Sequence, residues 1–456
     1  MLKKLFLLSV IFVSLGGCNE KQGLTIEKAY WGTWQSSGYG YIVDIINGEF
    51  TLYDIDTKYC VKQSASSDEI AQLLTHFEAF SNDKIGLGQS AKSKLYYFNR
   101  IDQLPSRCTQ QIENSPVVVV DQFATMMQEH YAFFDVHKVD WQERVKQAKS
   151  QVSSSTNDAE LFEILSKMMI GLNDGHLYIN ASLNGEVKQI SYGDSKVLKP
   201  TLDRAFSEQT DIKTRREFGR EWYKRTLANV DNVLNGDVNY AANNQIIWGS
   251  VGNTGYIKLR NMYGFEEDGS FADEINVVKT SMVNIVKELR GKSSIVIDLT
   301  TNSGGNDEIG RAIANYFTDE RVKLYSHSTL GSGEQASEYF TEPEPNPYLG
   351  NVIVYTSDHT VSAAETFTMA MKALPNVTHV GTTTRGALSD ILDKTLVNGW
   401  EVGLSNMTYL DAEDKLWEGI GVQPDIEFGV FDGDDIFTSH LDSTKRLVKM
   451  IETGQL

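Results

Sequence analysis

Ser362 lies where a predicted buried strand gives way to a predicted helix. Residues 351–355 (NVIVY) form a short β-branched run, which is typical of a buried strand. From position 362 onward the sequence SAAETFTMAM is typical of a helix. A serine at this point can be an N-cap that completes an S-x-x-E capping box with Glu365. It can also be a nucleophile, because the helix dipole and the free backbone N–H groups at a helix start stabilise an oxyanion. This window alone leaves both roles open.

Two other segments carry residue types suited to the same chemistry. His176 follows a glycine turn and precedes a predicted strand, and histidine can take up a proton near neutral pH. A single histidine can equally be structural. Gly304 and Gly305 follow the continuous apolar strand predicted at 294–299. A glycine pair lets the backbone approach a ligand and point its N–H groups at it. A phosphate loop is excluded, since the sequence has no G-x-x-x-x-G-K-[ST] motif.

The length and net charge of the chain limit the number of domains and the kinds of partner that it can have. The chain has 456 residues, of which 41% are hydrophobic, so it can bury large cores and form two or more domains. Its net charge of −19 argues against nucleic acid or an anionic membrane surface as a partner.

The N-terminus has the pattern of a secretory signal. Lys3 and Lys4 precede the apolar run 5–15, which is too short to span a bilayer as a stable helix. The sequence ending LGGC resembles a bacterial lipoprotein box, in which Cys18 is lipidated after removal of residues 1–17. An ordinary cleaved signal with an incidental cysteine is the alternative. The resemblance implies a periplasm-facing lipoprotein of the bacterial cell envelope, with the outer membrane favoured because Asn19 rather than aspartate follows the cysteine.

Two cysteines remain, Cys60 and Cys108. In an oxidising compartment such an isolated pair predicts one disulfide bond, and two free buried thiols are the alternative. Their spacing shows no metal-ligand pattern.

Residue patterns also divide the chain into segments. A strong hairpin turn is predicted at Asn47-Gly48, one helix over 67–80, and a C-terminal helix over roughly 436–451. We expect a signal peptide at 1–17, a small β-rich N-terminal domain at 18–112, a helical segment at 113–180, an insert of unclear structure with no recognisable PDZ domain at 181–250, and an α/β core at 251–456.

Four of these elements occur in an order that resembles the tricorn-type and C-terminal-processing (tail-specific) serine peptidase superfamily. They are the segment leading to Asp174-Gly175-His176, the strand and loop 298–305 (DLTTNSGG), the segment 362–365 (SAAE), and the loop 418–425 (EGIGVQPD). The resemblance covers roughly residues 117–456. One departure lies in the glycine loop, where the family usually has arginine and this chain has Thr300.

The resemblance implies an α/β fold with a crotonase-like (ClpP/crotonase) spiral peptidase core. It implies Ser362 as the nucleophile, and an oxyanion hole made by the N–H of Ala363 and an N–H from Gly304 or Gly305. Peptides or protein C-terminal tails are the implied substrates, and the chemistry needs no metal or organic cofactor.

The base divides the family. One branch uses a lysine in a T-x-G-K segment, but here that position holds Ala387, and Lys394 lies seven residues further on. The tricorn-type branch uses a histidine and a glutamate, which match His176 and Glu418. His359 is a rival base. A non-catalytic protein that binds peptides or hydrophobic ligands on the same fold is the alternative from another class.

Overall fold

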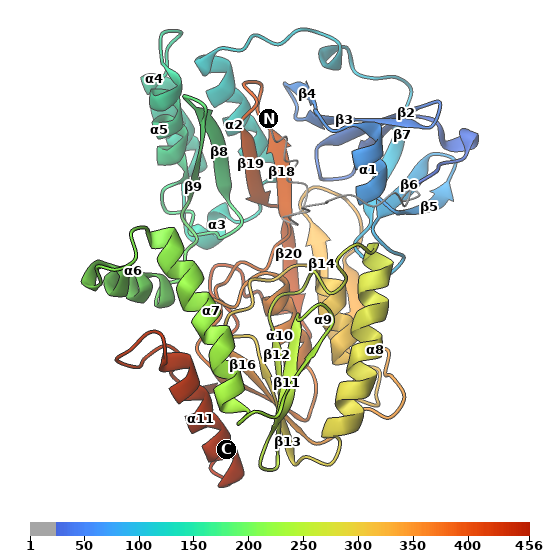
Figure 1. Cartoon of the computed structure of the whole chain (residues 1–456). Coiled ribbons are helices and arrows are strands. Elements are labelled where there is room, and N and C mark those ends of the chain that lie inside the picture. Colours follow the sequence, from blue (N-terminus) through green and yellow to red (C-terminus); the bar gives the residue numbers. More distant parts are fainter. Residues whose placement is uncertain (1–23) are drawn as a thin grey trace. The chain divides into compact units, whose positions relative to one another are not determined.

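The computed structural model describes residues 24–456, which form two compact units (Figure 1). The first unit contains residues 24–193, 328–336 and 389–408, and the second contains 194–327, 337–388 and 409–456. The signal peptide and Cys18 lie outside the described residues. The units cut across the expected boundaries, because the hairpin of β18 (Ile391–Thr395) and β19 (Glu401–Ser405) pairs with β8 (Tyr178–Leu183) of the first unit.

A seven-stranded antiparallel sheet forms the N-terminal part of the first unit, with strand order β4-β3-β2-β1-β7-β6-β5. The predicted turn at Asn47-Gly48 is confirmed: both residues have positive φ (54° and 83°), as a type I′ hairpin turn requires. The elements here are η1 (Lys28–Tyr30), β1 (Gly32–Ser36), β2 (Tyr41–Ile46), β3 (Glu49–Ile55), β4 (Cys60–Lys62), α1 (Ser67–Leu73), β5 (His76–Ser81), β6 (Lys84–Gly88), β7 (Tyr96–Ile101) and η2 (Ser106–Cys108).

The single helix expected over 67–80 is wrong. A capping box between Ser66 and Glu69 starts α1, but the helix ends at Leu73. The following residues form β5, which pairs with β6 through a short turn. Sheet pairing therefore overrides the local helical pattern of these residues, as tertiary context often does.

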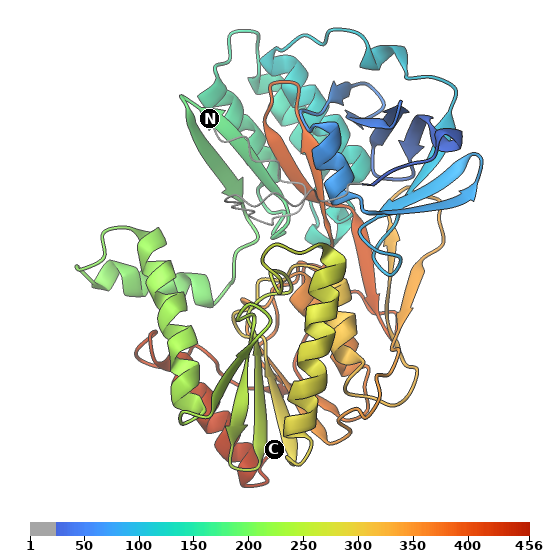
Figure 2. The same ribbon diagram turned by 45° about the vertical axis from the view of Figure 1, so that its right-hand side comes forward.

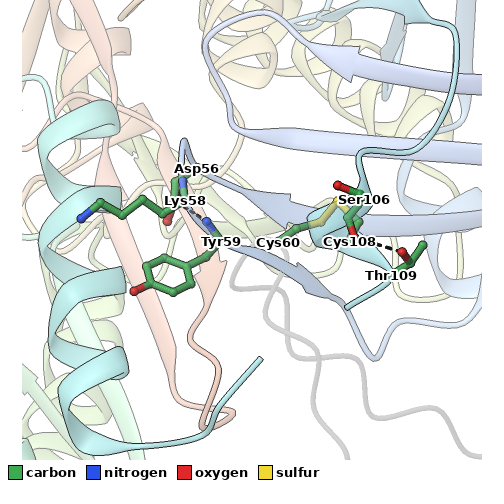
Figure 3. The surroundings of a disulfide bond; sticks show 7 residues. All are labelled: Asp56, Lys58, Tyr59, Cys60, Ser106, Cys108 and Thr109. Atoms are coloured by element: carbon green, nitrogen blue, oxygen red, sulfur yellow. Dashed lines mark hydrogen bonds between the residues drawn. A yellow bond between two sulfur atoms is a disulfide. The ribbon is translucent and has the colours of Figure 1, made fainter. Parts of the chain in front are cut away.

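Cys60 and Cys108 are joined by a disulfide bond (Figure 3). The bond connects β4, an edge strand of the N-terminal sheet, with η2 and closes a loop across a sequence separation of 48 residues. Cys60 packs with Ile42, Tyr53 and Ile55 in the small core of this sheet.

The rest of the first unit packs helices beside a second sheet of order β18-β19-β8-β9. Asn157 and Glu160 form the capping box that starts one of these helices, α5. The remaining elements are α2 (Pro116–His130), α3 (Phe134–His137), α4 (Trp141–Gln151), α5 (Asp158–Met169) and β9 (Glu186–Ser191).

The second unit is built on a seven-stranded sheet of order β10-β11-β12-β13-β16-β17-β21. Strands from β12 to β21 are parallel, so the loops that follow β13, β16 and β17 leave the sheet at the same edge. The strands are β10 (Val238–Ala241), β11 (Ile246–Val251), β12 (Thr254–Leu259), β13 (Ser294–Asp298), β16 (Asn351–Thr356), β17 (Val377–Gly381) and β21 (Ile426–Glu427), with β14 (Lys323–Thr329), β15 (Ser337–Phe340) and β20 (Met407–Asp411) in a separate three-stranded sheet.

Helices cover both faces of this parallel sheet (Figure 2). One face packs against α7 and α11, which lie side by side, through residues such as Tyr256, Trp222 and Leu447. On the opposite face, Leu289 of α8 packs directly over Gly255 of β12. The helices are α6 (Leu198–Glu208), α7 (Arg215–Val233), α8 (Phe271–Leu289), α9 (Asp307–Ala314), α10 (Ala363–Lys372) and α11 (Ser439–Glu452).

The structure is therefore mixed α/β, with several sheets. Among residues 24–456, no helix combines the length and apolarity that crossing a membrane requires.

Candidate active site

Ser362 occupies a strained turn between β16 and α10. Its φ of 61° and ψ of −130° are rare for a residue with a side chain, and such a conformation costs about 1–3 kcal/mol. The hydroxyl approaches the Glu365 amide as in a capping box, but that N–H donates to the Ser362 carbonyl oxygen at 2.7 Å. Ser362 is half-buried, and its strained turn between a strand and a helix is the backbone geometry of a nucleophile elbow rather than of an ordinary helix cap.

The Glu365 side chain holds the chain around this turn. It is fully buried, and its Oε2 accepts hydrogen bonds from the N–H groups of Ser362 (3.1 Å) and Ala387 (2.9 Å). Its Oε1 accepts from the Gly386 N–H and the Thr384 hydroxyl, both at 2.6 Å. Burial raises the pKa of Glu365, while these four donors oppose the shift. Glu365 thus joins the serine turn to residues 384–387.

The glycine loop after β13 lies directly beside this turn. A Cβ on Gly304, whose φ is 89°, would lie 2.6 Å from the Ser362 Cβ, so only glycine fits there. The Gly304 N–H donates to the Asn302 side chain at 2.9 Å. Within residues 24–456, the N–H groups of Gly305 and Ala363 have no acceptor on the protein. These two donors are the ones available to an oxyanion.

Glu418 lies in the same unit as Ser362, in the loop before the C-terminal part of the chain. It is 1% exposed, and its Oε2 accepts the Leu388 N–H at 2.8 Å. The loop is tied to the segment beside the serine, because the Gly419 N–H donates to the Gly386 carbonyl oxygen at 2.8 Å. Glu418 and Ser362 therefore sit on two segments that both bond to residues 386–388.

His176 belongs to the first unit. Its backbone N–H donates to the buried Asp174 carboxylate at 2.8 Å, which fixes the turn that carries the ring. Gly193 packs so closely on Gly175 that any side chain would collide with the backbone of this turn. The ring is 6% exposed, at the start of β8.

The two rival bases have other surroundings. The Lys394 ammonium lies in the first unit, where it donates to the Gly40 carbonyl oxygen at 2.6 Å and pairs with Asp54 at 3.3 Å. The His359 ring lies against Trp222, and burial together with Arg385 lowers the pKa of His359 to about 3. A histidine with so low a pKa is a poor base at neutral pH.

A pocket of about 560 Å³ opens in the second unit, at the ends of β16 and β17. Asp358, Arg385 and Ile420 are among its lining residues. Asp358 lies four residues before Ser362, and the backbone N–H of Arg385 donates to the Thr360 carbonyl oxygen at 2.9 Å. The pocket is therefore lined in part by residues next to the serine turn. No group of three or more metal-ligating side chains lies together in the described part of the chain.

Serine, a buried carboxylate and unpaired backbone N–H groups at one sheet edge are the parts of a serine hydrolase. Comparison with known proteins agrees with this class. Residues 253–428 match the family model of peptidase family S41, and residues 121–170 match that of the tricorn protease C1 domain. The chain therefore contains a peptidase S41 domain and a tricorn C1 domain, and it is a serine-type peptidase, a hydrolase that acts on peptides or proteins.

Solved structures show the same fold at low sequence identity. A provisionally assigned peptidase from Parabacteroides merdae aligns with a TM-score of 0.57 and 23% identity, covering 74% of this chain and 97% of that one. Mature CPAF aligns with a TM-score of 0.52 and 14% identity, covering 75% and 98%. A serine-to-alanine mutant of CPAF aligns with a TM-score of 0.50 and 13% identity, covering 74% and 98%.

Proposed function

We propose that this serine peptidase cleaves peptides or protein C-terminal tails in the periplasm through Ser362, His176 and Glu418. The Ser362 hydroxyl attacks the scissile carbonyl carbon while His176 accepts its proton. His176 then gives that proton to the leaving amine, and water hydrolyses the acyl-enzyme by the reverse sequence. Glu418 orients the imidazole ring and stabilises the imidazolium that forms.

The observation that carries this proposal is the backbone of Ser362. A non-glycine residue with φ of 61° stores strain that only its surroundings can maintain, and Glu365 and the Gly304 loop supply those surroundings. A serine that served only as a helix cap would adopt the extended conformation usual at that position.

We propose that the oxyanion hole consists of the N–H groups of Ala363 and Gly305, which have no acceptor among residues 24–456. Each such donor contributes about 3–4 kcal/mol to stabilising the tetrahedral intermediate. The hydrogen bond between the Gly304 N–H and the Asn302 side chain favours Gly305 over Gly304 as the second donor. The pocket beside Arg385 gives space for a substrate side chain.

The parallel strands β12, β13, β16 and β17 and the helices between them are further proposed to be a crotonase-like α/β spiral. The repeated order of strand and helix, with Ser362 and the glycine loop at one edge of the sheet, supports this assignment.

Hydrolysis of fluorescein-labelled casein and of a peptide library, together with labelling by a fluorophosphonate probe, tests the triad. We expect Ser362→Ala to abolish labelling and to lower kcat by about 10⁴-fold or more, with a similar loss for His176→Ala. Glu418→Gln should lower kcat by about 10²-fold or more, since the carboxylate acts through the histidine. Full hydrolysis and labelling by Ser362→Ala would disprove the mechanism.

His359→Ala and Lys394→Met are the matched controls for the base. If His176 is the base, both controls keep kcat within about tenfold of the wild-type value while His176→Ala does not. A loss of several orders of magnitude in one control, with His176→Ala active, would move the role to that residue.

Lipid attachment at Cys18 and a periplasm-facing, outer-membrane location are proposed from the signal pattern alone. Growth of an expressing bacterium with labelled palmitate should label the wild-type protein and not Cys18→Ser. Recovery of both proteins, unlabelled, in the soluble periplasmic fraction would reject the anchor.

A further inference from the structure

A cluster of titratable side chains is completely buried in the second unit, next to the start of the glycine loop. Lys258 on β12 lies 3.1 Å from Oδ1 of Asp298, the last residue of β13. The His440 ring on α11 lies 2.8 Å from the other oxygen of Asp298, and Tyr256 donates its hydroxyl to that same oxygen. The exposed fractions of Lys258, Asp298 and His440 are 0%, 0% and 1%.

Stability alone is a poor explanation for such a cluster. Taking a lysine and an aspartate out of water carries a desolvation penalty that often exceeds their attraction, and apolar replacements are frequently neutral or stabilising. Burial would raise the pKa of Asp298, but Lys258 and His440 hold it well below its usual range, so the carboxylate stays ionised. The charge therefore persists at a place where an apolar core would serve the fold equally well.

The ionised carboxylate is the first link in a chain of contacts to the serine turn. Oδ1 of Asp298 accepts hydrogen bonds from the N–H (2.8 Å) and the hydroxyl (2.7 Å) of Thr300, at the start of the glycine loop. The Thr300 carbonyl oxygen accepts the Ser357 hydroxyl at 2.6 Å, five residues before the nucleophile. Asp298 thus fixes the beginning of the loop against the segment that carries Ser362.

The strand that carries Lys258 holds the rest of the loop. The carbonyl oxygen of the next residue, Leu259, accepts the Asn302 side-chain N–H at 3.1 Å, and the oxygen of that amide accepts the Gly304 N–H at 2.9 Å. Further along, the Met262 N–H donates to the Gly304 carbonyl oxygen at 2.8 Å. The loop is therefore tied to the last residue of β12, Leu259, and to Met262 three residues further on.

We propose that Lys258, Asp298 and His440 are positioning residues. They hold the glycine loop in the position from which the Gly305 N–H donates to the oxyanion. This inference rests on the proposed function and deepens it. The C-terminal helix α11 takes part through His440, so the end of the chain contributes to catalytic geometry without touching substrate.

The test is steady-state hydrolysis by Lys258→Met, with a fluorogenic peptide chosen from the library that the wild-type enzyme cleaves. We expect kcat to fall at least tenfold with KM within about twofold, and the fluorophosphonate labelling rate to fall in parallel. Peptide binding should be equal in Ser362→Ala and in Ser362→Ala combined with Lys258→Met. Lys258→Arg, which keeps the cation, should recover at least a third of the wild-type kcat.

Ser443→Ala is the matched control. Ser443 is equally buried on α11, one turn after His440, and it accepts the Tyr355 hydroxyl at 3.0 Å without touching Asp298. Its loss should lower the melting temperature and leave kcat within twofold. An unchanged kcat in folded Lys258→Met, or an equal loss of kcat in Ser443→Ala, would overturn the proposal.

Thr300→Val decides the question if Lys258→Met does not fold, because it removes only the hydroxyl that donates to Asp298. A fall of kcat of about threefold or more at constant KM supports the positioning role, and an unchanged kcat rejects it. Failure of the proposed peptidase function is distinguishable from these outcomes. In that case Ser362→Ala would hydrolyse the peptide as fast as the wild-type enzyme.

Discussion

Replacing Glu365 by glutamine changes one atom of the residue that joins the serine turn to residues 384–387. Each carboxylate oxygen accepts two hydrogen bonds, one pair from Gly386 and Thr384 and the other from Ser362 and Ala387. The glutamine amide has one oxygen that accepts and one NH₂ that only donates. Either orientation of the amide therefore turns a donor toward at least one backbone N–H.

The cost follows from this count. A buried N–H left without an acceptor costs about 1–3 kcal/mol, and a hydrogen bond to a charged group contributes about 1.5–3 kcal/mol, more than a neutral one. The Ser362 N–H has the Ala387 carbonyl oxygen as a second acceptor at 3.0 Å, so it is not orphaned. We therefore expect Glu365→Gln to lower the free energy of unfolding by about 2–5 kcal/mol.

Urea unfolding followed by circular dichroism measures this loss, and hydrogen exchange of the peptide containing Gly386 and Ala387 locates it. Thr368→Val, on the same helix and equally buried, is the control, since its hydroxyl donates only to the Ala364 carbonyl oxygen at 2.7 Å. That variant should lose less than about 1 kcal/mol. A loss below 1 kcal/mol for Glu365→Gln, with unchanged exchange at residues 386–387, would refute the reasoning.

Three further predictions concern single sites. Gly304→Ala should lower kcat at least 100-fold in a steady-state assay, because the new methyl group would lie 2.6 Å from the Ser362 Cβ; an active variant would show that the loop is not fixed. Replacing Cys60 and Cys108 by serine should lower the free energy of unfolding in urea by about 4 kcal/mol, because the disulfide closes a loop of 48 residues in the unfolded chain. A wild-type protein whose free energy of unfolding is the same with and without reductant would contradict this. Burial, with Lys372 nearby, lowers the pKa of His379 to about 3, below the unfolded value near 6.5; stability should therefore fall by about 1.4 kcal/mol per unit as pH drops from 6.5 toward 3, and His379→Gln should flatten this slope.

The sequence was most informative where a motif is local. The strand, the turn at Ser362 and the helix that follows depend on neighbouring residues, and the structure has β16, the turn and α10 at those places. The disulfide between Cys60 and Cys108 was foreseen because few alternatives existed for an isolated pair. The Ser362 turn could be predicted from a few neighbouring residues, and the disulfide could be predicted because only two cysteines remain after Cys18.

Long-range pairings could not be foreseen in the same way. Residues 389–408 follow the serine helix by only a few elements, yet their strand β19 pairs with β8, more than 200 positions earlier. No periodicity in the sequence encodes which strand a hairpin joins, because the pairing depends on faces that only the folded unit creates. The same applies to Lys258, whose burial beside Asp298 depends on the parallel pairing of β12 with β13.

The two roles that the sequence left open for Ser362 are compatible in the structure. Glu365 accepts the Ser362 N–H, as a capping box requires, and the same carboxylate binds Ala387, whose carbonyl oxygen also accepts that N–H. This double hold is available only when the serine N–H points toward residues 384–387, which the unusual φ of 61° permits. The cap contact thereby helps to maintain the strain that a proposed nucleophile uses, and it leaves the Ala363 N–H without a protein acceptor within the described chain.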